Sequence, residues 1–463
     1  MHNIKYTMKL KISITIAAIF YIFNIIMLAQ TDTLVTMKSN AAKVQLLLNW
    51  TPKTAKIKAN GSILTRNKQA YVPINIDSTI VITTEKNVQL TELNCRSNRL
   101  TKLDVSCDLS LIRLNCSYNQ LIQLDVSKNP ALIELECSSN QLTELDVSKN
   151  MNLRLLFCDN NPLIQLDVSK NTALEELWCS KNQLSQLNIS KNIVLKKLYC
   201  YDNQLIQLNI SQNTVLKELQ CFDNQLIQLD VSKNIALERL FCKNNQLTQL
   251  DVFKNLTLKT LYCDANQLAQ LDISKNVALK EFSCSNNQLT QLDVSKNTVL
   301  RFIGCCDNQL TQLDVSKNRV LDELGCSFNQ LIQLNVSKNR ALESLNCSNN
   351  PFTQLDVSKN TALEELKCSD NQLSLLDVSK NMNLKALFCN NNQLTQLDLL
   401  KNPRLKSLNC SNNQLTQLDL SNMGLWRLYA SGQQVKLPFV DGSISFSNPI
   451  FYKTYKGGRS NYN

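Results

Sequence analysis

The sequence predicts a solenoid, a stack of near-identical coils whose short β-strands pair side by side in one parallel sheet. Three observations predict this fold. The pattern L-x-x-L-x-C-x-x-N-x-L-x-x-L-x-V-x-x-N-x-x recurs end to end from Leu90 without insertion or deletion, each copy carries a cysteine, and an asparagine follows that cysteine three positions later. The pattern repeats every 21 residues, and a fixed period of this length is typical of repeat proteins. The sixteen cysteines that mark the copies are Cys95, Cys116, Cys137, Cys158, Cys179, Cys200, Cys221, Cys242, Cys263, Cys284, Cys305, Cys326, Cys347, Cys368, Cys389 and Cys410.

Residues 1–29 are predicted to be a signal peptide. Lys5, Lys9 and Lys11 precede an apolar run from Ile12 to Leu28, and cleavage is expected after Ala29. An uncleaved membrane anchor is the alternative, because the run is slightly long for a signal peptide. No later stretch is apolar over the length of a bilayer span. We therefore expect a secreted protein, soluble or attached to the outer surface of a bacterium, whose formal charge falls from +11 to +8 when three lysines are removed.

Residues 30–87 lack the repeat and are predicted to form a small β cap on the first coil. Strand-like runs at 44–50 and 78–84 are separated by turn residues. A cap is needed because the end coil of a solenoid has a neighbour on one side only.

Residues 88–423 form the predicted array of sixteen repeats. In the copy that starts at Leu174, Leu177 and Cys179 point inward and Trp178 points outward, as in a strand with alternating faces. Asn182 is expected to turn the chain and to bond backbone groups of neighbouring coils, which makes the asparagines a hydrogen-bonded ladder. The parallel sheet should curve along a concave side, with short irregular or 3-10 segments on the convex side.

Residues 424–463 are predicted to be a degenerate terminal repeat followed by a tail. Five residues imitate a repeat that starts one residue early, with alanine in place of cysteine and glutamine in place of asparagine; they are Leu425, Leu428, Ala430, Gln433 and Val435. The remaining residues are too few for a further domain.

The copies closely resemble a known family. Segments such as CSNNQL at 284–289 and LTQLDVSKN at 289–297 are similar to the LDVSKN-type leucine-rich repeats of secreted and surface proteins of Bacteroidetes-like bacteria, and more distantly to the internalins. The resemblance covers residues 88–435 and implies an α/β-type leucine-rich-repeat solenoid that recognises proteins outside the cell. We expect no C-terminal anchoring domain of the kind found in this family.

The composition argues against catalysis. The one histidine, His2, lies in the predicted signal segment, so neither a histidine base nor imidazole metal ligands are expected in the mature chain, and we predict no enzyme activity, cofactor or metal. The ladder cysteines are interpreted as buried apolar thiols rather than disulfides, because stacked side chains point the same way. Only Cys107 and Cys306 are expected to react. Lysines recur three positions after an acidic or amide column, and these acids argue against nucleic-acid binding.

Large aromatic residues gather at outward strand positions in consecutive copies, and acidic residues recur three positions before the cysteines. Exposed aromatic clusters usually mark interfaces. We therefore expect a partner protein to bind the concave face of a monomeric chain. A glycan-binding surface, a purely structural spacer, and rings that merely stack on one another are the alternatives. The residues predicted to contact the partner are Phe157, Trp178, Tyr199, Tyr201, Phe222, Phe241, Tyr262, Glu134, Glu176 and Glu218.

Overall fold

The computed structural model describes residues 31–41, 43–51, 56–60, 62–66, 70–73, 79–85, 88–420, 427–431, 444–447 and 450–453. The predicted signal peptide lies outside these residues. The chain divides into two compact units, 1–195 and 196–463, which are treated separately below. Within the described segments, no helix has the length and apolar character needed to cross a membrane.

The first unit opens with a five-stranded antiparallel sheet in the order β4-β3-β6-β1-β8. Its strands are β1 (Thr31–Ser39), β3 (Ile57–Ala59), β4 (Ser62–Leu64), β6 (Thr79–Glu85) and β8 (Leu100–Asp104). Val35 and Met37 of β1 and Ile80 and Ile82 of β6 are buried, so the inner face of this sheet is apolar.

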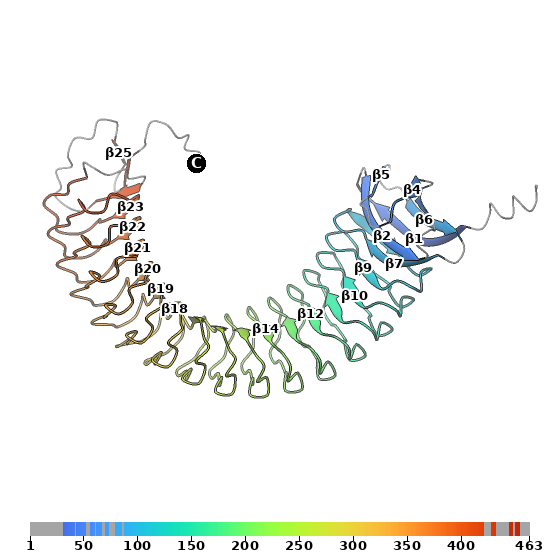
Figure 1. Cartoon of the computed structure of the whole chain (residues 1–463), viewed down its shortest axis with the longest axis horizontal. Helices are drawn as coiled ribbons and strands as arrows, with labels where there is room; N and C mark the ends of the chain where they lie inside the picture. Colours follow the sequence, from blue (N-terminus) through green and yellow to red (C-terminus); the bar gives the residue numbers. More distant parts are fainter. Residues whose placement is uncertain are drawn as a thin grey trace, which may run out of the picture. The chain divides into compact units, whose positions relative to one another are not determined.

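A second sheet of the first unit carries the first repeats. Strand β2 pairs antiparallel with β5 and β7, and from β7 onward every strand is parallel to the next (Figure 1). The strands are β5 (Ala70–Pro73), β2 (Lys43–Thr51), β7 (Gln89–Asn94), β9 (Arg113–Asn115), β10 (Glu134–Glu136), β11 (Leu155–Phe157) and β12 (Glu176–Trp178). The first coil thus gives β7 to this sheet and β8 to the antiparallel one, which ties it to the cap on both sides.

The cap also closes the first end of the asparagine ladder. The side-chain oxygen of Asn98 accepts the backbone N–H of Gln45 at 2.6 Å, and its amide donates to the Gln45 carbonyl at 2.6 Å. Strand β2 therefore supplies the hydrogen-bonding partners that a preceding coil supplies elsewhere. Strands β2 and β6 coincide with the strand-like runs predicted at 44–50 and 78–84.

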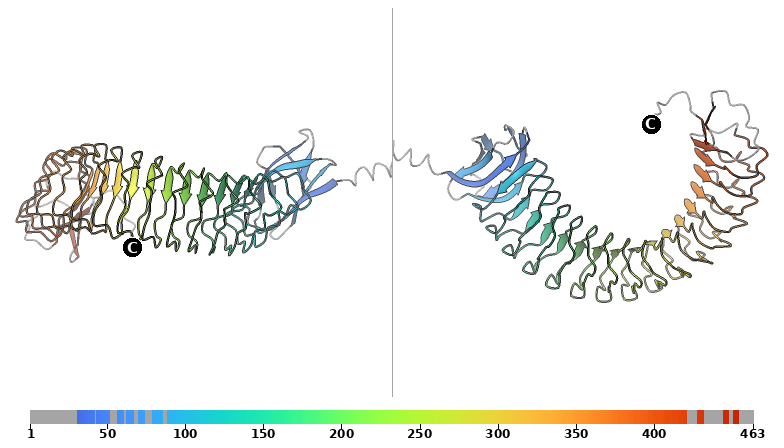
Figure 2. Two further views of the ribbon diagram at one scale, coloured as in Figure 1. Left: turned by 90° about the horizontal axis from the view of Figure 1, so that it is seen from below. Right: turned by 180° about the vertical axis from the view of Figure 1, so that it is seen from behind.

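The second unit contains twelve parallel strands in register, most of them one full repeat from the next. The coils of this unit follow an arc, and their strands lie side by side on the inner side of that arc (Figures 1 and 2). The strands are β13 (Lys197–Tyr199), β14 (Glu218–Gln220), β15 (Arg239–Phe241), β16 (Thr260–Tyr262), β17 (Glu281–Ser283), β18 (Phe302–Gly304), β19 (Glu323–Gly325), β20 (Ser344–Asn346), β21 (Glu365–Lys367), β22 (Ala386–Phe388), β23 (Ser407–Asn409) and β24 (Arg427–Tyr429).

The end of the repeat array in this unit keeps its pairing despite a shorter step. Leu408 of β23 lies opposite Leu428 of β24, which comes one position earlier than a full repeat would place it, and both Leu428 and Ala430 are buried. This agrees with the predicted repeat that starts one residue early; Leu425, Gln433 and Val435 lie outside the described residues. A separate antiparallel pair joins β25 (Ile444–Ser447) to β26 (Ile450–Lys453).

One coil shows how the pattern folds. In the coil of β21, Leu366 and Cys368 are buried, and the amide of Asn371 donates to the carbonyls of Cys368 at 3.0 Å and Cys347 at 3.2 Å. Its side-chain oxygen accepts the N–H of Phe352 at 3.2 Å. The same contacts recur along each unit, so the predicted asparagine ladder is confirmed.

The return side of the coil is built from turns. In the same coil the Val378 carbonyl accepts the N–H of Asn381 at 2.9 Å, and the Asn381 carbonyl accepts the N–H of Leu384 at 3.0 Å. These are single bonds with a spacing of three rather than the successive bonds of a 3-10 helix. No helix occurs among the residues that the structure describes, so the predicted 3-10 segments and the α/β description are not confirmed. The molecule is a β-solenoid of about sixteen turns.

A second asparagine ladder follows the return side and was not predicted. Asn381, which is fully buried, donates to the carbonyls of Asn360 at 2.8 Å and Val357 at 3.0 Å in the preceding coil. The signal for it was present in the sequence, because asparagine occupies this position in nearly every copy. A nearly constant amide on an otherwise variable corner indicates a buried hydrogen-bonding role.

Candidate functional site

Most strands of the array place an exposed or half-buried side chain on each side of a buried leucine. In β15, Leu240 is buried while Arg239 and Phe241 face outward. The residue after the cysteine, Lys243 in this coil, also lies partly exposed. We call these three positions, repeated in every coil, the outward strand face.

In the first unit the predicted aromatic residues of this face stack. The rings of Phe157 and Trp178 lie 4.4 Å apart with 27° between their planes, and both side chains are half-buried. Their strands pair with Phe157 opposite Trp178, so the repeat places one ring directly over the next. Stacking covers part of the surface that the sequence suggested would be fully exposed.

In the second unit Tyr199, Tyr201, Phe222, Phe241 and Tyr262 are likewise half-buried. Tyr201 and Phe222 stack at 4.3 Å with 7° between their planes, and the ammonium group of Lys243 lies over the Phe222 ring, 5.1 Å from its centre. Phe241 and Tyr262 meet edge to face at 5.2 Å. Four of these five residues therefore contact one another in pairs that join neighbouring coils.

One further ring belongs to the group and was missed from the sequence. Phe302 lies 6.1 Å from Tyr262 in an edge-to-face contact, although it occupies a column that holds charged or polar residues in most coils. A Cβ atom on Gly304 would lie 2.5 Å from the Ser283 hydroxyl oxygen and 3.2 Å from the tip of the Phe302 ring, so both side chains pack closely against the glycine. The signal was the pairing of a phenylalanine with a glycine two positions later in one strand.

Tyr262 also has an unusual electrostatic environment. Its hydroxyl donates to Glu281 at 3.3 Å. Partial burial, followed by the nearby carboxylate of Glu281, raises the pKa of Tyr262 to about 12. The hydroxyl therefore stays protonated and acts as a hydrogen-bond donor at neutral pH.

The acidic border predicted beside the aromatic residues is largely engaged in ion pairs. Glu134 pairs with Arg113 at 3.0 Å, and Glu218 lies 3.8 Å from Arg239. Each pair joins adjacent coils, so these carboxylates stabilise the stack as well as bordering the face. Glu176 lies at the equivalent position of β12.

The cysteines form a buried column without disulfides. All 18 are free, sixteen of them buried, while Cys107 is exposed and Cys306 is partly exposed. Burial raises the pKa of the Cys95, Cys221 and Cys347 thiols to about 12, so these thiols stay protonated. Within the described part of the chain, no group of three or more histidine, cysteine or carboxylate side chains is placed to hold a metal ion.

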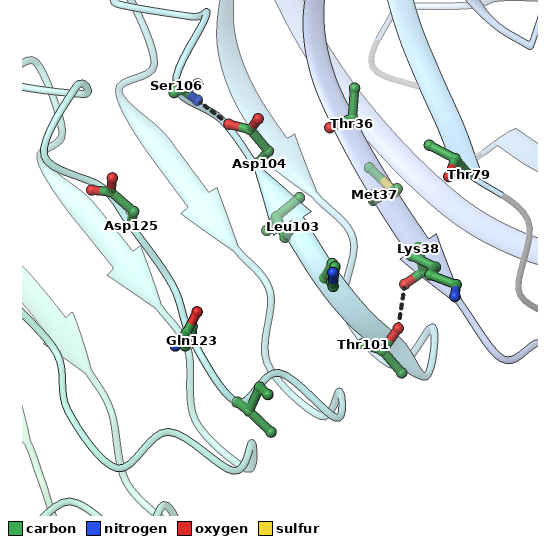
Figure 3. Close-up of a pocket in the computed structure, with 12 residues that line it drawn as sticks. Thr36, Met37, Lys38, Thr79, Thr101, Leu103, Asp104, Ser106, Gln123 and Asp125 are labelled. Atoms are coloured by element: carbon green, nitrogen blue, oxygen red, sulfur yellow. Dashed lines mark hydrogen bonds between the residues drawn. The ribbon is translucent and has the colours of Figure 1, made fainter.

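A groove of about 670 Å³ lies in the first unit, between the antiparallel sheet and the return segment of the next coil (Figure 3). Lys38 and Lys102 line it together with Asp104 and Asp125. Asp104 already accepts the backbone N–H of Ser106 at 2.9 Å. The groove contains none of the residues predicted to contact a partner, and its mixed charges favour no single class of ligand.

Comparisons with known proteins agree with the repeat architecture. The Leucine Rich Repeat family profile matches residues 404–427. The functional domain of InlJ from Listeria monocytogenes, described as including a cysteine ladder, is 33% identical with a TM-score of 0.65, over 71% of this chain and 74% of that one. A leucine-rich-repeat protein of Leptospira interrogans is 24% identical with a TM-score of 0.64, over 74% of this chain and 90% of that one.

YopM from Yersinia enterocolitica is 25% identical with a TM-score of 0.57, over 72% of this chain and 76% of that one. No curated protein sequence matches the chain significantly. The repeat pattern, the stacked parallel strands and these similarities lead to one assignment: the chain belongs to the leucine-rich-repeat proteins.

Proposed function

We propose that the chain is exported and binds a partner protein through the aromatic residues of its outward strand face. The observation that carries this proposal is the group of four half-buried rings in neighbouring coils, in which Tyr201 stacks on Phe222 and Phe241 meets Tyr262 edge to face. Rigid aromatic groups of this kind bury much surface at little entropic cost when a protein covers them. The localisation outside the cell rests on the predicted signal peptide.

The geometry of the rings favours a protein over a glycan. A sugar stacks on the open face of an aromatic ring, but Tyr201 covers one face of Phe222 and the Lys243 ammonium lies over the ring as well. The partly exposed rings and the lysine beside them suit the mixed apolar and polar contacts of a protein interface.

The proposal assigns no reaction to the chain. The buried thiols of Cys95, Cys221 and Cys347 are held protonated by their raised pKa. A purely structural spacer remains the second candidate, because rings that stack along a ladder also stabilise the stack itself.

The test is a cross-linking pull-down with the mature full-length protein and with a Phe222→Ser/Phe241→Ser variant. Serine occurs at both positions in another coil, as Ser285 and Ser283, so the variant should fold and its circular dichroism should match the wild type. An Asn346→Ser variant, at the Phe241 position of a coil without aromatic residues there, is the matched control.

We expect a partner protein, identified by mass spectrometry, to be captured by the wild type and the control and lost from the aromatic variant. Equal capture by all three proteins would show that the rings serve the stack alone. A glycan array probed with the same proteins tests the sugar alternative; glycans that bind the wild type and not the aromatic variant would displace the protein hypothesis.

A further inference from the structure

One ring of the outward strand face lies between two carboxylates in the second unit. Phe302 of β18 pairs with Glu281 of β17 on one side and with Glu323 of β19 on the other. Both glutamates are exposed, whereas Phe302 is half-buried. All three residues occupy the first position of their strands, so neighbouring strands place them about 5 Å apart along the sheet. We call these three residues, together with Tyr262, the Phe302 group.

Tyr262 brings the Phe302 group together. Its ring meets Phe302 edge to face at 6.1 Å, and its hydroxyl donates to Glu281 at 3.3 Å. Partial burial raises the pKa of this tyrosine, and the carboxylates of Glu281, Asp264 and Glu323 raise it further. The glutamates on either side of Phe302 therefore lie close enough to one hydroxyl to act on it together.

Neither glutamate of the Phe302 group has a cation of its own. Among the residues described by the structure, no lysine or arginine forms an ion pair with Glu281 or Glu323. Glutamates at the same position of three other coils do have such partners. Glu134 and Glu365 lie 3.0 Å from an arginine and a lysine, and Glu218 lies 3.8 Å from an arginine. The glutamates beside Phe302 are therefore available to a cation from outside the chain.

The other charges of the five coils from β16 to β20 do not neutralise the Phe302 group. The outward strand face of these coils carries three carboxylates and no lysine or arginine; the carboxylates are those of Asp264, Glu281 and Glu323. The positions just before and just after this face contribute three cations and three carboxylates, which balance; they are Lys259, Lys280, Arg301, Asp307, Asp322 and Glu343. Lys259 already pairs with Glu238 at 2.6 Å. Arg301 pairs with Asp322, also at 2.6 Å. The face itself therefore keeps a net negative charge.

Another coil of the same unit contains a comparable group with its cation in place. The ammonium group of Lys367 lies 3.0 Å from the Glu365 carboxylate and 5.8 Å from the centre of the Phe388 ring. One cation thus joins a carboxylate and a ring on the outward strand face. Within the described part of the chain, no lysine or arginine lies over the ring of Phe302 or Tyr262. The Phe302 group has the ring and the carboxylates of this arrangement without the cation.

We infer that the Phe302 group receives a basic side chain of the partner protein, an arginine or lysine that lies over the Phe302 ring and pairs with Glu281 and Glu323. A cation is attracted to the face of an aromatic ring, and charge-assisted hydrogen bonds to carboxylates hold it there. The inference rests on the proposed function, because the basic residue belongs to the partner that the outward strand face binds. It adds the chemistry and the position of one contact.

The probe for the test is a phage-displayed library of random peptides, selected on the mature full-length protein. We expect the selected peptides to contain Arg or Lys, to bind more weakly as salt is raised, and to bind a Glu281→Gln/Glu323→Gln variant about tenfold more weakly or worse. Glutamine keeps the size of the side chain and an oxygen that can accept the Tyr262 hydroxyl, so this variant removes charge alone. Circular dichroism checks that it folds.

A Glu134→Gln/Glu365→Gln variant is the matched control. Both glutamates occupy the position of Glu281 in their own strands, and each is already paired with a cation of the chain. The control changes the net charge by the same amount and should bind the peptides as tightly as the wild type. Peptides without basic residues, undiminished binding to the Glu281→Gln/Glu323→Gln variant, an equal loss in both charge variants, or a selection that enriches no peptide would overturn the inference.

The Phe222→Ser/Phe241→Ser variant separates this inference from the proposed function. Basic peptides that bind this variant as they bind the wild type, together with a pull-down in which the two rings make no difference, would support the inference and contradict the proposed role of those rings. Peptides that depend on the two rings and not on the glutamates would support the proposed function and overturn the inference.

Discussion

At the residue scale, one position of every coil adopts a left-handed backbone. The residue two after each ladder cysteine has a positive φ, from Ser97 at 59° to Asn412 at 53°. Asparagine or aspartate occupies most copies, as expected for residues that tolerate this conformation. The sequence displays that preference, but the conformation behind it became clear only in the structure.

Phe328 violates this preference, since it is a bulky exposed residue with φ at 53°. Replacing it with asparagine should stabilise the protein by about 1 kcal/mol, because the left-handed conformation costs a residue with a large side chain roughly that much. Urea unfolding of the two proteins measures the difference. A Phe328→Tyr variant should show no gain, and an equal gain in both variants would mean that the backbone is not the cause.

The asparagine ladder has a larger effect at a single residue. Asn245 donates to the carbonyls of Cys221 and Cys242, each at 3.1 Å, and accepts the N–H of Leu226 at 2.9 Å. An Asn245→Leu substitution leaves these buried backbone groups without partners and should destabilise the protein by about 3 kcal/mol or more. The exposed neighbour Gln246 offers a control, because Gln246→Ala should change the free energy of unfolding by less than about 0.5 kcal/mol.

At the scale of the element, the acidic column belongs to a turn. Asp293 and Asp314 accept the backbone N–H two positions later at 2.8 Å, as Asp377 does. The sequence suggested only a solvated row of charges. The clue was the substitution of asparagine at 188, 209 and 335, because asparagine shares with aspartate the oxygen that accepts this bond.

These turns make stability depend on pH. The hydrogen bond from the backbone N–H lowers the pKa of Asp293, Asp314 and Asp377 below the ordinary value of 3.8. A carboxylate with a lowered folded pKa stabilises the protein above its unfolded pKa, and this contribution is lost as the pH falls through the folded pKa. An Asp293→Asn/Asp314→Asn/Asp377→Asn variant should lose less stability than the wild type between about pH 5 and pH 2. Unfolding curves at each pH give the free energy of unfolding of both proteins. An equal loss of stability in the wild type and the variant below about pH 5 would contradict the role of these turns.

The cysteine column is an element whose chemistry was predictable. Small side chains that stack in register and point inward are expected to be buried and unreactive, and the structure confirms the burial for sixteen of the 18. A thiol reagent should modify two cysteines, Cys107 and Cys306, in the native protein and all 18 after denaturation. Rapid native labelling of a ladder cysteine, located by peptide mapping, would show that the column opens.

At the scale of the whole molecule, the sequence predicted the repeating coils, but it did not predict how the cap pairs with the first coil or how individual coils depart from the repeat. The period determines which strands pair and which leucines are buried. The cap departs from any local pattern, because β1 pairs with the much later strand β8 and draws the return side of the first coil into a separate sheet. Likewise, the contact of Phe302 with Tyr262 joins β18 to β16 across the intervening strand, which is a property of packing between coils.

Stability in such a stack should be transmitted only between neighbours. Asn287 and Asn308 both donate to the carbonyl of Cys284, at 3.0 Å each, so their effects are coupled. Substituting both with leucine should deviate from additivity by about 0.5 kcal/mol or more, whereas Asn287→Leu combined with Asn371→Leu, several coils away, should be additive. Double-mutant cycles from urea unfolding distinguish the two cases, and equal coupling in both would argue for long-range cooperativity.

The constant step between paired strands has a consequence for how the gene can change. From β13 to β23 each strand pairs with a strand one full repeat later in the chain. Duplication or deletion of a repeat-length stretch of codons by unequal recombination therefore adds or removes one coil without disturbing the pairing of the other coils. A frame-preserving change of one codon inside a strand instead turns its side chains to the opposite face. Over evolution the chain can therefore lengthen or shorten by whole repeats. A repeat whose surface residues depart from the common pattern can be copied to a new position in the array in the same way.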